Sequence, residues 1–189
     1  MADDPSLAAA CLDEFRRGFR GYKRLGDGAL AQISDQQFFH LPDPESNSIA
    51  LVVKHIAGNL RSRWTDFLTS DGEKPDRNRD QEFVLAPADS RESLMQRWEH
   101  SWQTVFDQIQ GLKPEDMMRT VYIRSEPHTV LQALARSFAH IAYHVGQIAY
   151  LGKHIRGTEW KSLSIPKGRS ADFNAMKPED RKAKGPMKG

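Results

Sequence analysis

The sequence contains only one cysteine in 189 residues, and it contains no long apolar run. With Cys11 alone an internal disulfide is excluded, which is typical of proteins in a reducing compartment. A helix that spans a bilayer needs about 20 apolar residues in succession, and no segment approaches that length. The first residues, MADDPSLAAACLDEF, carry acids where a signal peptide needs positive charge. We therefore expect a cytoplasmic protein without a membrane segment.

Positive charge is concentrated at the end of the chain rather than on the predicted helices. Residues 156–189 hold nine Lys or Arg and four Asp or Glu, so this segment carries a charge of +5 and residues 1–155 carry −3. A nucleic-acid-binding protein normally has a basic stripe on its folded body. We expect no nucleic-acid partner, a folded domain over residues 1–155, and a basic, partly disordered extension over residues 156–189.

Strand signals are also scarce, whereas helical periodicity is strong. Four segments have apolar residues at three- and four-residue steps, which predicts amphipathic helices over about residues 5–33, 48–69, 90–110 and 129–155. A short apolar and polar alternation at 120–124 predicts a strand or one arm of a β-hairpin before the last helix. These elements predict an all-α protein, a four-helix bundle in which the long connection after the second helix permits a crossover.

Two histidines lie four residues apart in the last predicted helix, within the stretch FAHIAYHVGQI. At this spacing His140 and His144 lie one above the other on the same helix face. Their row borders the apolar stripe of the helix and includes the small residues Ala133 and Ser137. Small side chains leave space, so the pattern indicates a pocket at the edge of the core.

A third histidine, His55, lies at the edge of the apolar stripe of the second predicted helix. Three imidazoles on rigid helices suit zinc, nickel, copper or ferrous iron, and three protein ligands leave one position open for water or substrate. The alternative is that these are core-edge histidines satisfied by ordinary hydrogen bonds. Residues 141–143 are Ile-Ala-Tyr, so the glutamate of the H-E-x-x-H metalloprotease motif is absent. The Glu-x-x-His pairs of ferritin-like di-iron bundles are absent as well.

The histidine pattern resembles that of the DinB/YfiT-like superfamily, which has one histidine on the second helix and H-x-x-x-H, often followed by Gly-Gln, on the fourth. The match is closer to one subgroup of unknown function, through KHIAGNLRSRWTDFLTSDGEKPDRNRDQEF at 54–83, VYIRSEPHTV at 121–130 and SLSIPKG at 162–168. The resemblance implies a divalent metal held by His55, His140 and His144, and frequent homodimers. It also implies kinship to metal-dependent transferases that use low-molecular-weight thiols, but it supplies no reaction.

Four polar side chains are further candidates for the pocket. Asn59 lies one turn after His55, and Gln147 lies about one turn after His144, so either could orient a ligand, a water or a substrate. Tyr143 and Arg136 flank the histidine row and could meet an anionic substrate. All four could equally be partly exposed helix residues.

The segment from Asp71 to Glu82 is dense in opposite charges. One interpretation is a solvated loop with weak surface ion pairs. The other is an ordered lid or a dimer contact that uses Arg77 and Arg79.

These observations support two classes of function. The first is an enzyme in which one divalent metal, zinc, nickel or iron, activates a thiol or water for thiol transfer to, or hydrolysis of, a small molecule. The second is a non-catalytic metal- or ligand-binding stress protein. A structural metal site is normally closed by four protein ligands, and only three can be named, so the sequence favours an open site.

Overall fold

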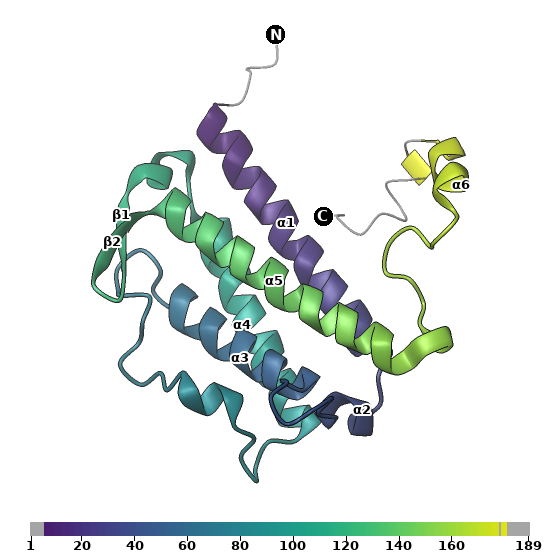
Figure 1. Ribbon diagram of the computed structural model, residues 1–189. Coiled ribbons are helices and arrows are strands. Elements are labelled where there is room, and N and C mark those ends of the chain that lie inside the picture. The colour runs from purple at the N-terminus through teal and green to yellow at the C-terminus, as the bar shows by residue number, and fades with distance from the viewer. Residues whose placement is uncertain (1–5, 178, 181–189) are drawn as a thin grey trace.

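Four long helices lie side by side around one hydrophobic core (Figure 1). The computed structural model describes residues 6–177 and 179–180. The long helices are α1 (Leu7–Leu30), α3 (Ile49–Trp64), α4 (Arg91–Gly111) and α5 (Val130–Arg156). Helix α3 packs against both α4 and α5, and α1 packs against α5. None of the described helices contains an apolar stretch long enough to cross a membrane.

Shorter elements connect and flank these helices. They are α2 (Asp35–Phe39), η1 (Asp80–Phe83), η2 (Pro114–Met118), β1 (Thr120–Ile123), β2 (Glu126–Thr129), η3 (Gly157–Glu159) and α6 (Ser170–Ala175). Strands β1 and β2 form an antiparallel hairpin. Its turn residues Arg124 and Ser125 both have left-handed φ angles, of 57° and 63°, as a tight two-residue hairpin turn requires. The predictions of a mostly helical protein and of a short hairpin before the last long helix are confirmed.

The starts of the long helices follow from short polar side chains in the sequence. Ser48, Ser90 and Thr129 each accept a hydrogen bond from a backbone N–H in the first turn of α3, α4 and α5 respectively. Such caps satisfy donors that have no partner within the helix. The residues at which these helices begin are therefore fixed by local hydrogen bonds.

The end of α3 differs from the prediction. The apolar periodicity extends to Phe67, but the helix ends at Trp64 because Thr65 is extended and Asp66 has a left-handed φ of 49°. Phe67 is nevertheless buried, and its ring stacks on that of Trp64 with centroids 5.0 Å apart. An apolar residue can thus continue a helical spacing while reaching the core from a turn.

The first part of the predicted C-terminal extension contacts the helices. Gln32, two residues after the end of α1, exchanges two hydrogen bonds with the backbone of Lys161. Trp160 and Leu163 pack against the hydrophobic core. The remainder of the extension that was expected to be disordered includes residues 178 and 181–189, which lie outside the described residues.

Candidate metal centre

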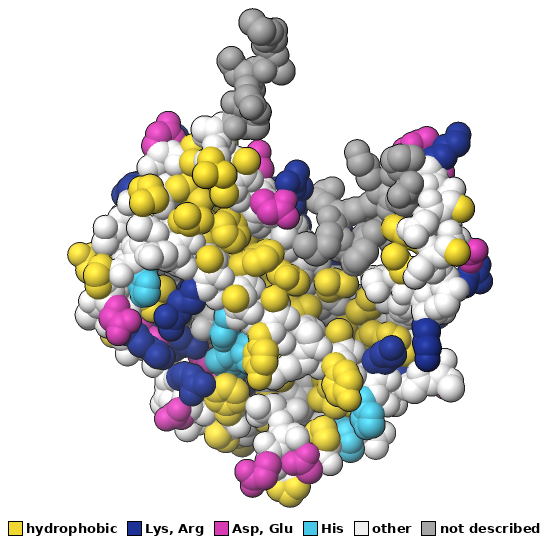
Figure 2. Space-filling model, turned by 45° about the horizontal axis from the view of Figure 1, so that its top comes forward, with side chains coloured by type: hydrophobic (Ala, Val, Ile, Leu, Met, Phe, Trp, Pro, Cys, Tyr) yellow, Lys and Arg dark blue, Asp and Glu magenta, His cyan; other side chains and the backbone are white. Residues whose placement is uncertain are grey.

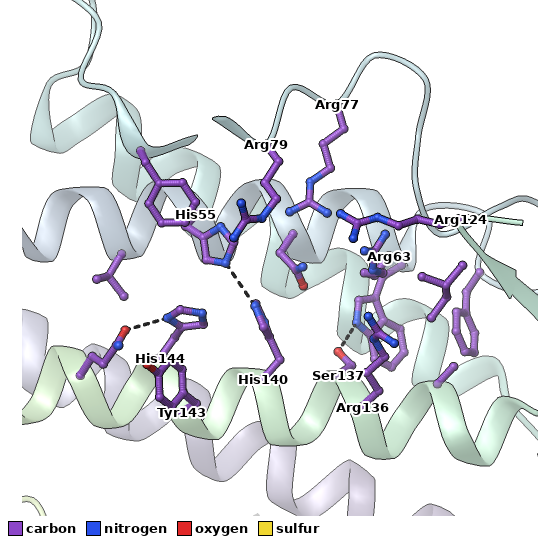
Figure 3. Close-up of a pocket in the computed structure, with 18 of the residues that line it drawn as sticks. His55, Arg63, Arg77, Arg79, Arg124, Arg136, Ser137, His140, Tyr143 and His144 are labelled. Carbon is purple, nitrogen blue, oxygen red and sulfur yellow. Dashed lines mark hydrogen bonds between the residues drawn. The ribbon is translucent and has the colours of Figure 1, made fainter. Parts of the chain in front are cut away.

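The three predicted histidines meet between α3 and α5 (Figure 3). His55 comes from α3, and His140 and His144 come from α5. One ring nitrogen of each lies within 4.8 Å of the corresponding atom in the other two. The Nε2 atoms of His55 and His140 are only 3.1 Å apart. Two helices that are distant in sequence thus bring three imidazoles to one point, and these residues could hold a metal ion.

Two of the histidines are oriented through their outer nitrogen. His55 Nδ1 lies 2.8 Å from a carboxylate oxygen of Glu82, and His144 Nδ1 lies 2.7 Å from the amide oxygen of Gln147. These oxygens are acceptors, so Nδ1 carries the proton in each contact. In a neutral imidazole, Nε2 then has a free lone pair directed at the other histidines. This is the tautomer that a metal ligand needs.

Burial keeps the two histidines of α5 uncharged. It lowers the pKa of His140 to about 3, and the neighbouring His144 and His55 add to the effect. Burial also lowers the pKa of His144. Metal ligands must be deprotonated, so protons do not compete for these nitrogens at neutral pH. Neutral imidazoles in a partly buried site form a donor set that fits zinc, nickel, copper or ferrous iron.

Glu82 is held in place by a buried arginine. Arg77 donates from Nε to one oxygen at 2.8 Å and from Nη2 to the other at 3.0 Å, which is a two-point contact with planar geometry. Burial alone would raise the pKa of Glu82, but hydrogen bonds from His55 and Arg77 outweigh it, and the pKa lies below its ordinary value. The carboxylate therefore remains charged and continues to orient His55.

A glycine on α3 makes room for this carboxylate. A Cβ atom at Gly58 would lie 2.3 Å from Oε1 of Glu82, so any side chain at this position would have to displace the carboxylate. Next to Glu82, the ring of Phe83 stacks on the His55 imidazole with centroids 4.7 Å apart. His55 is thus fixed by a carboxylate on one side and by an aromatic ring on its face.

The histidines lie at one end of a cavity of about 470 Å³, a volume typical of small-molecule sites. Guanidinium groups from four parts of the chain line the rest of the cavity (Figure 3). Arg63, Arg124 and Arg136 lie at the end opposite the histidines, which we call the arginine part, and Arg77 and Arg79 lie nearer to His55. No carboxylate lines this cavity in the described part of the chain. On the molecular surface, basic side chains gather beside a patch of histidine (Figure 2).

All four additional candidates from the sequence line the cavity. Gln147 contacts His144 directly, and Asn59 is buried one turn along α3 from His55. Tyr143 lies at the rim, 65% exposed, with its ring 4.9 Å from that of His144. Arg136 is exposed and belongs to the arginine part of the cavity. The remaining histidines, which were left out of the predicted site, join no such cluster among the described residues.

For the charged segment 71–82 the sequence left two interpretations open, a solvated loop and an ordered lid or dimer contact that uses Arg77 and Arg79. The segment supplies Glu82 and Arg77 to the centre, so it is not a solvated loop, and the role of Glu82 was not predicted. Ser62 of α3 holds its start through hydrogen bonds with Gly72 and Lys74. The available signal was Phe83, an apolar residue directly after a charged run, which marks a point where the chain returns to the core.

Comparison with known proteins gives one family. Residues 6–169 match the model of a family described as a protein of unknown function, DUF1572. A comparison with curated proteins gives no match. Because the family model covers most of the chain, the protein belongs to the DUF1572 family.

Proposed function

We propose that His55, His140 and His144 bind one divalent metal ion, zinc, nickel or iron, and that the protein is a metal-dependent enzyme acting on a small molecule. The observation that carries the proposal is the convergence of three imidazole nitrogens at one end of a cavity of about 470 Å³. Three protein ligands leave a position for a substrate, as in catalytic rather than structural sites. The cavity provides the space for that substrate beside the histidines.

When bound, the metal would supply Lewis-acid activation of a thiol or of water, for thiol transfer or for hydrolysis. The residues of the chain bind and orient. Glu82 and Gln147 fix the rings of His55 and His144. Glu82 is not free to act as a general base, because His55 and Arg77 both use its oxygens. The activity therefore depends on the metal rather than on a carboxylate of the site.

The arrangement of four long helices with one histidine on α3 and an H-x-x-x-H pair on α5 supports a DinB/YfiT-like four-helix bundle. We extend the proposal to that fold type, to a low-molecular-weight thiol as a substrate, to a cytoplasmic location and to a homodimer.

Light scattering coupled to size-exclusion chromatography measures the mass of the proposed homodimer directly. A monomeric mass at micromolar concentration would remove that part of the proposal.

Elemental analysis tests the metal first. Protein purified without chelators and without a metal-affinity tag should contain about one equivalent of a transition metal. Turnover is then measured with thiol-plus-electrophile mixtures and with ester substrates, before and after metal removal. Stoichiometric metal without turnover across the panel would favour a non-catalytic metal- or ligand-binding protein. Absence of bound metal, together with failure to take up added zinc, nickel or ferrous iron, would overturn the proposal.

A further inference from the structure

The arginines that line the cavity carry more positive charge than the neighbouring carboxylates compensate. One oxygen of Glu73 is shared by Arg63 at 2.8 Å, Arg124 at 3.1 Å and Arg77 at 3.3 Å. The other carboxylate, Glu82, is used by Arg77 and His55. Two carboxylates therefore pair with three arginines and one histidine, and Asp71 adds one further negative charge near Arg63.

Two further guanidiniums increase the excess of positive charge. Arg136 lines the cavity from α5 and makes no hydrogen bond or ion pair within the described residues. Arg79 lies over the ring of Phe83, and its contact with the exposed Asp80 is 4.0 Å long. Such a long surface contact contributes little. The cavity thus has an unbalanced positive charge before any metal is bound.

Arg63 shows that this charge is costly to the free protein. Burial lowers the pKa of its guanidinium, although Glu73 acts in the opposite direction. An arginine remains charged at neutral pH in spite of such a shift. A buried charge is stabilised by a partner of opposite sign, and Glu73 is already shared. An anion in the cavity would supply that partner.

The arginines and the histidines are also spaced for one small ligand. Hydrogen bonding between Trp64 and Ser137 joins α3 and α5 at the arginine part, with Nε1 and Oγ 3.1 Å apart. Arg136 precedes His140 by four residues on α5, and Arg63 follows His55 by eight residues on α3. These separations correspond to about 6 and 12 Å along the helix axes. A metabolite of moderate size can span them.

We propose that the ligand of this cavity is an organic anion, whose carboxylate or phosphate group is bound by Arg63, Arg124 and Arg136 while its other end reaches the histidines. Guanidinium groups recognise both kinds of anion through paired hydrogen bonds. The cavity volume of about 470 Å³ suits a small molecule. The contact between the ligand and the histidines rests on the proposed metal site, whereas binding of the anionic group concerns only the arginines.

The test uses metal-free, full-length protein, so that anion binding is measured apart from metal binding. Inorganic phosphate and glutarate are titrated by calorimetry in a low-salt Tris buffer, and glutaramide serves as the uncharged analogue of glutarate. We expect one saturable site that weakens as salt is added. The tighter of the two anions identifies the group that the arginines prefer, and either result supports the proposal.

Variants localise the site. Arg136→Gln and Arg124→Gln should each weaken anion binding by about tenfold or more, because each removes charged hydrogen-bond donors. Arg61→Gln is the matched control, since Arg61 lies on α3 but pairs with Asp76 outside the cavity. Equal binding of glutaramide and glutarate, or unchanged binding in both cavity variants, would overturn the proposal.

A failure of the metal proposal gives a different pattern. If elemental analysis finds no metal but the arginine variants still weaken anion binding, the anion proposal is supported and the metal proposal is wrong. If metal binds stoichiometrically and no anion binds, the anion proposal is wrong and the metal proposal is supported.

Discussion

The two ends of the cavity are built in different ways. At the histidine end the ligands come from the middle of two long helices, and the side chain of His55 is 4% exposed. At the arginine end the groups come from helices, the charged segment and the hairpin turn, and the side chain of Arg124 is 51% exposed. A metal needs ligands placed within a fraction of an ångström, whereas attraction of an anion tolerates movement. Two regular helices carry the histidines, whereas helices, a loop and a turn carry the arginines, and this difference in secondary structure matches the two requirements.

The largest expected effect comes from removing one of the three histidines at the histidine end. His140→Ala should lower metal affinity by at least about 100-fold, because the remaining two imidazoles cannot fill the site. Elemental analysis after dialysis measures the loss. His100→Ala is the control, since His100 is an exposed histidine on α4. A His140→Ala protein that keeps one equivalent of metal would show that the ligand assignment is wrong.

Removing the support of a ligand should have the next largest effect. Glu82→Gln keeps the shape of the side chain but removes the charge that orients His55 and pairs with Arg77. Loss of such a partner typically weakens metal binding by about 10- to 100-fold. Competition with a chromogenic chelator measures the affinity. Asp80→Asn in the same turn is the control, because its side chain is 94% exposed.

An equal loss of affinity in Asp80→Asn and Glu82→Gln would mean that the charge of the whole segment matters rather than the contact with His55. A normal affinity in Glu82→Gln would mean that the position of His55 is fixed by α3 and Phe83 alone. The comparison between the two variants therefore separates orientation from general electrostatics.

Gly58→Ala tests the same support without changing any polar group. The added methyl would meet Glu82 Oε1 at 2.3 Å, so the carboxylate must move away from α3. Overpacking of this kind costs about 1–3 kcal/mol in the free energy of unfolding. Metal affinity should fall about three- to tenfold, less than in Glu82→Gln, since the carboxylate is displaced rather than lost.

The control for this variant is Gly146→Ala on α5. A Cβ atom at Gly146 meets nothing within 4 Å, although the residue is close in sequence to His144. We expect unchanged metal affinity and a gain of about 0.5–1 kcal/mol in the free energy of unfolding, because alanine favours the helix. Chemical denaturation measures both variants. If Gly58→Ala lowered neither the metal affinity nor the free energy of unfolding, Glu82 would be able to move away from α3 without losing its contact with His55.

The same contrast explains what could be predicted from the sequence. His55, His140 and His144 lie on helices with clear apolar periodicity, and a regular helix converts sequence spacing into position. Glu82 and Arg124 lie in a 3₁₀ turn and at a hairpin turn, where spacing does not fix direction. Their place in the site depends on contacts between segments distant in sequence, such as Asp71 accepting hydrogen bonds from the backbone of the hairpin turn. Those contacts have no periodic signature.

The smallest expected effect is the electrostatic repulsion between an arginine at one end of the cavity and a metal ion at the other end. Arg136→Gln removes one positive charge one helical turn before His140, about 6 Å away along the axis of α5, and should raise metal affinity, because the cation is repelled less. For charges of +1 and +2 at about 6 Å, the energy in water is about 1.4 kcal/mol before screening, and physiological salt reduces it by about half. The increase should therefore stay below about threefold and should disappear at high salt. Chelator competition at two salt concentrations measures it, with Arg136→Lys as the control that keeps the charge. A fall in metal affinity would contradict the division of the cavity, because it would make Arg136 part of the support of the histidines rather than a separate site for an anion.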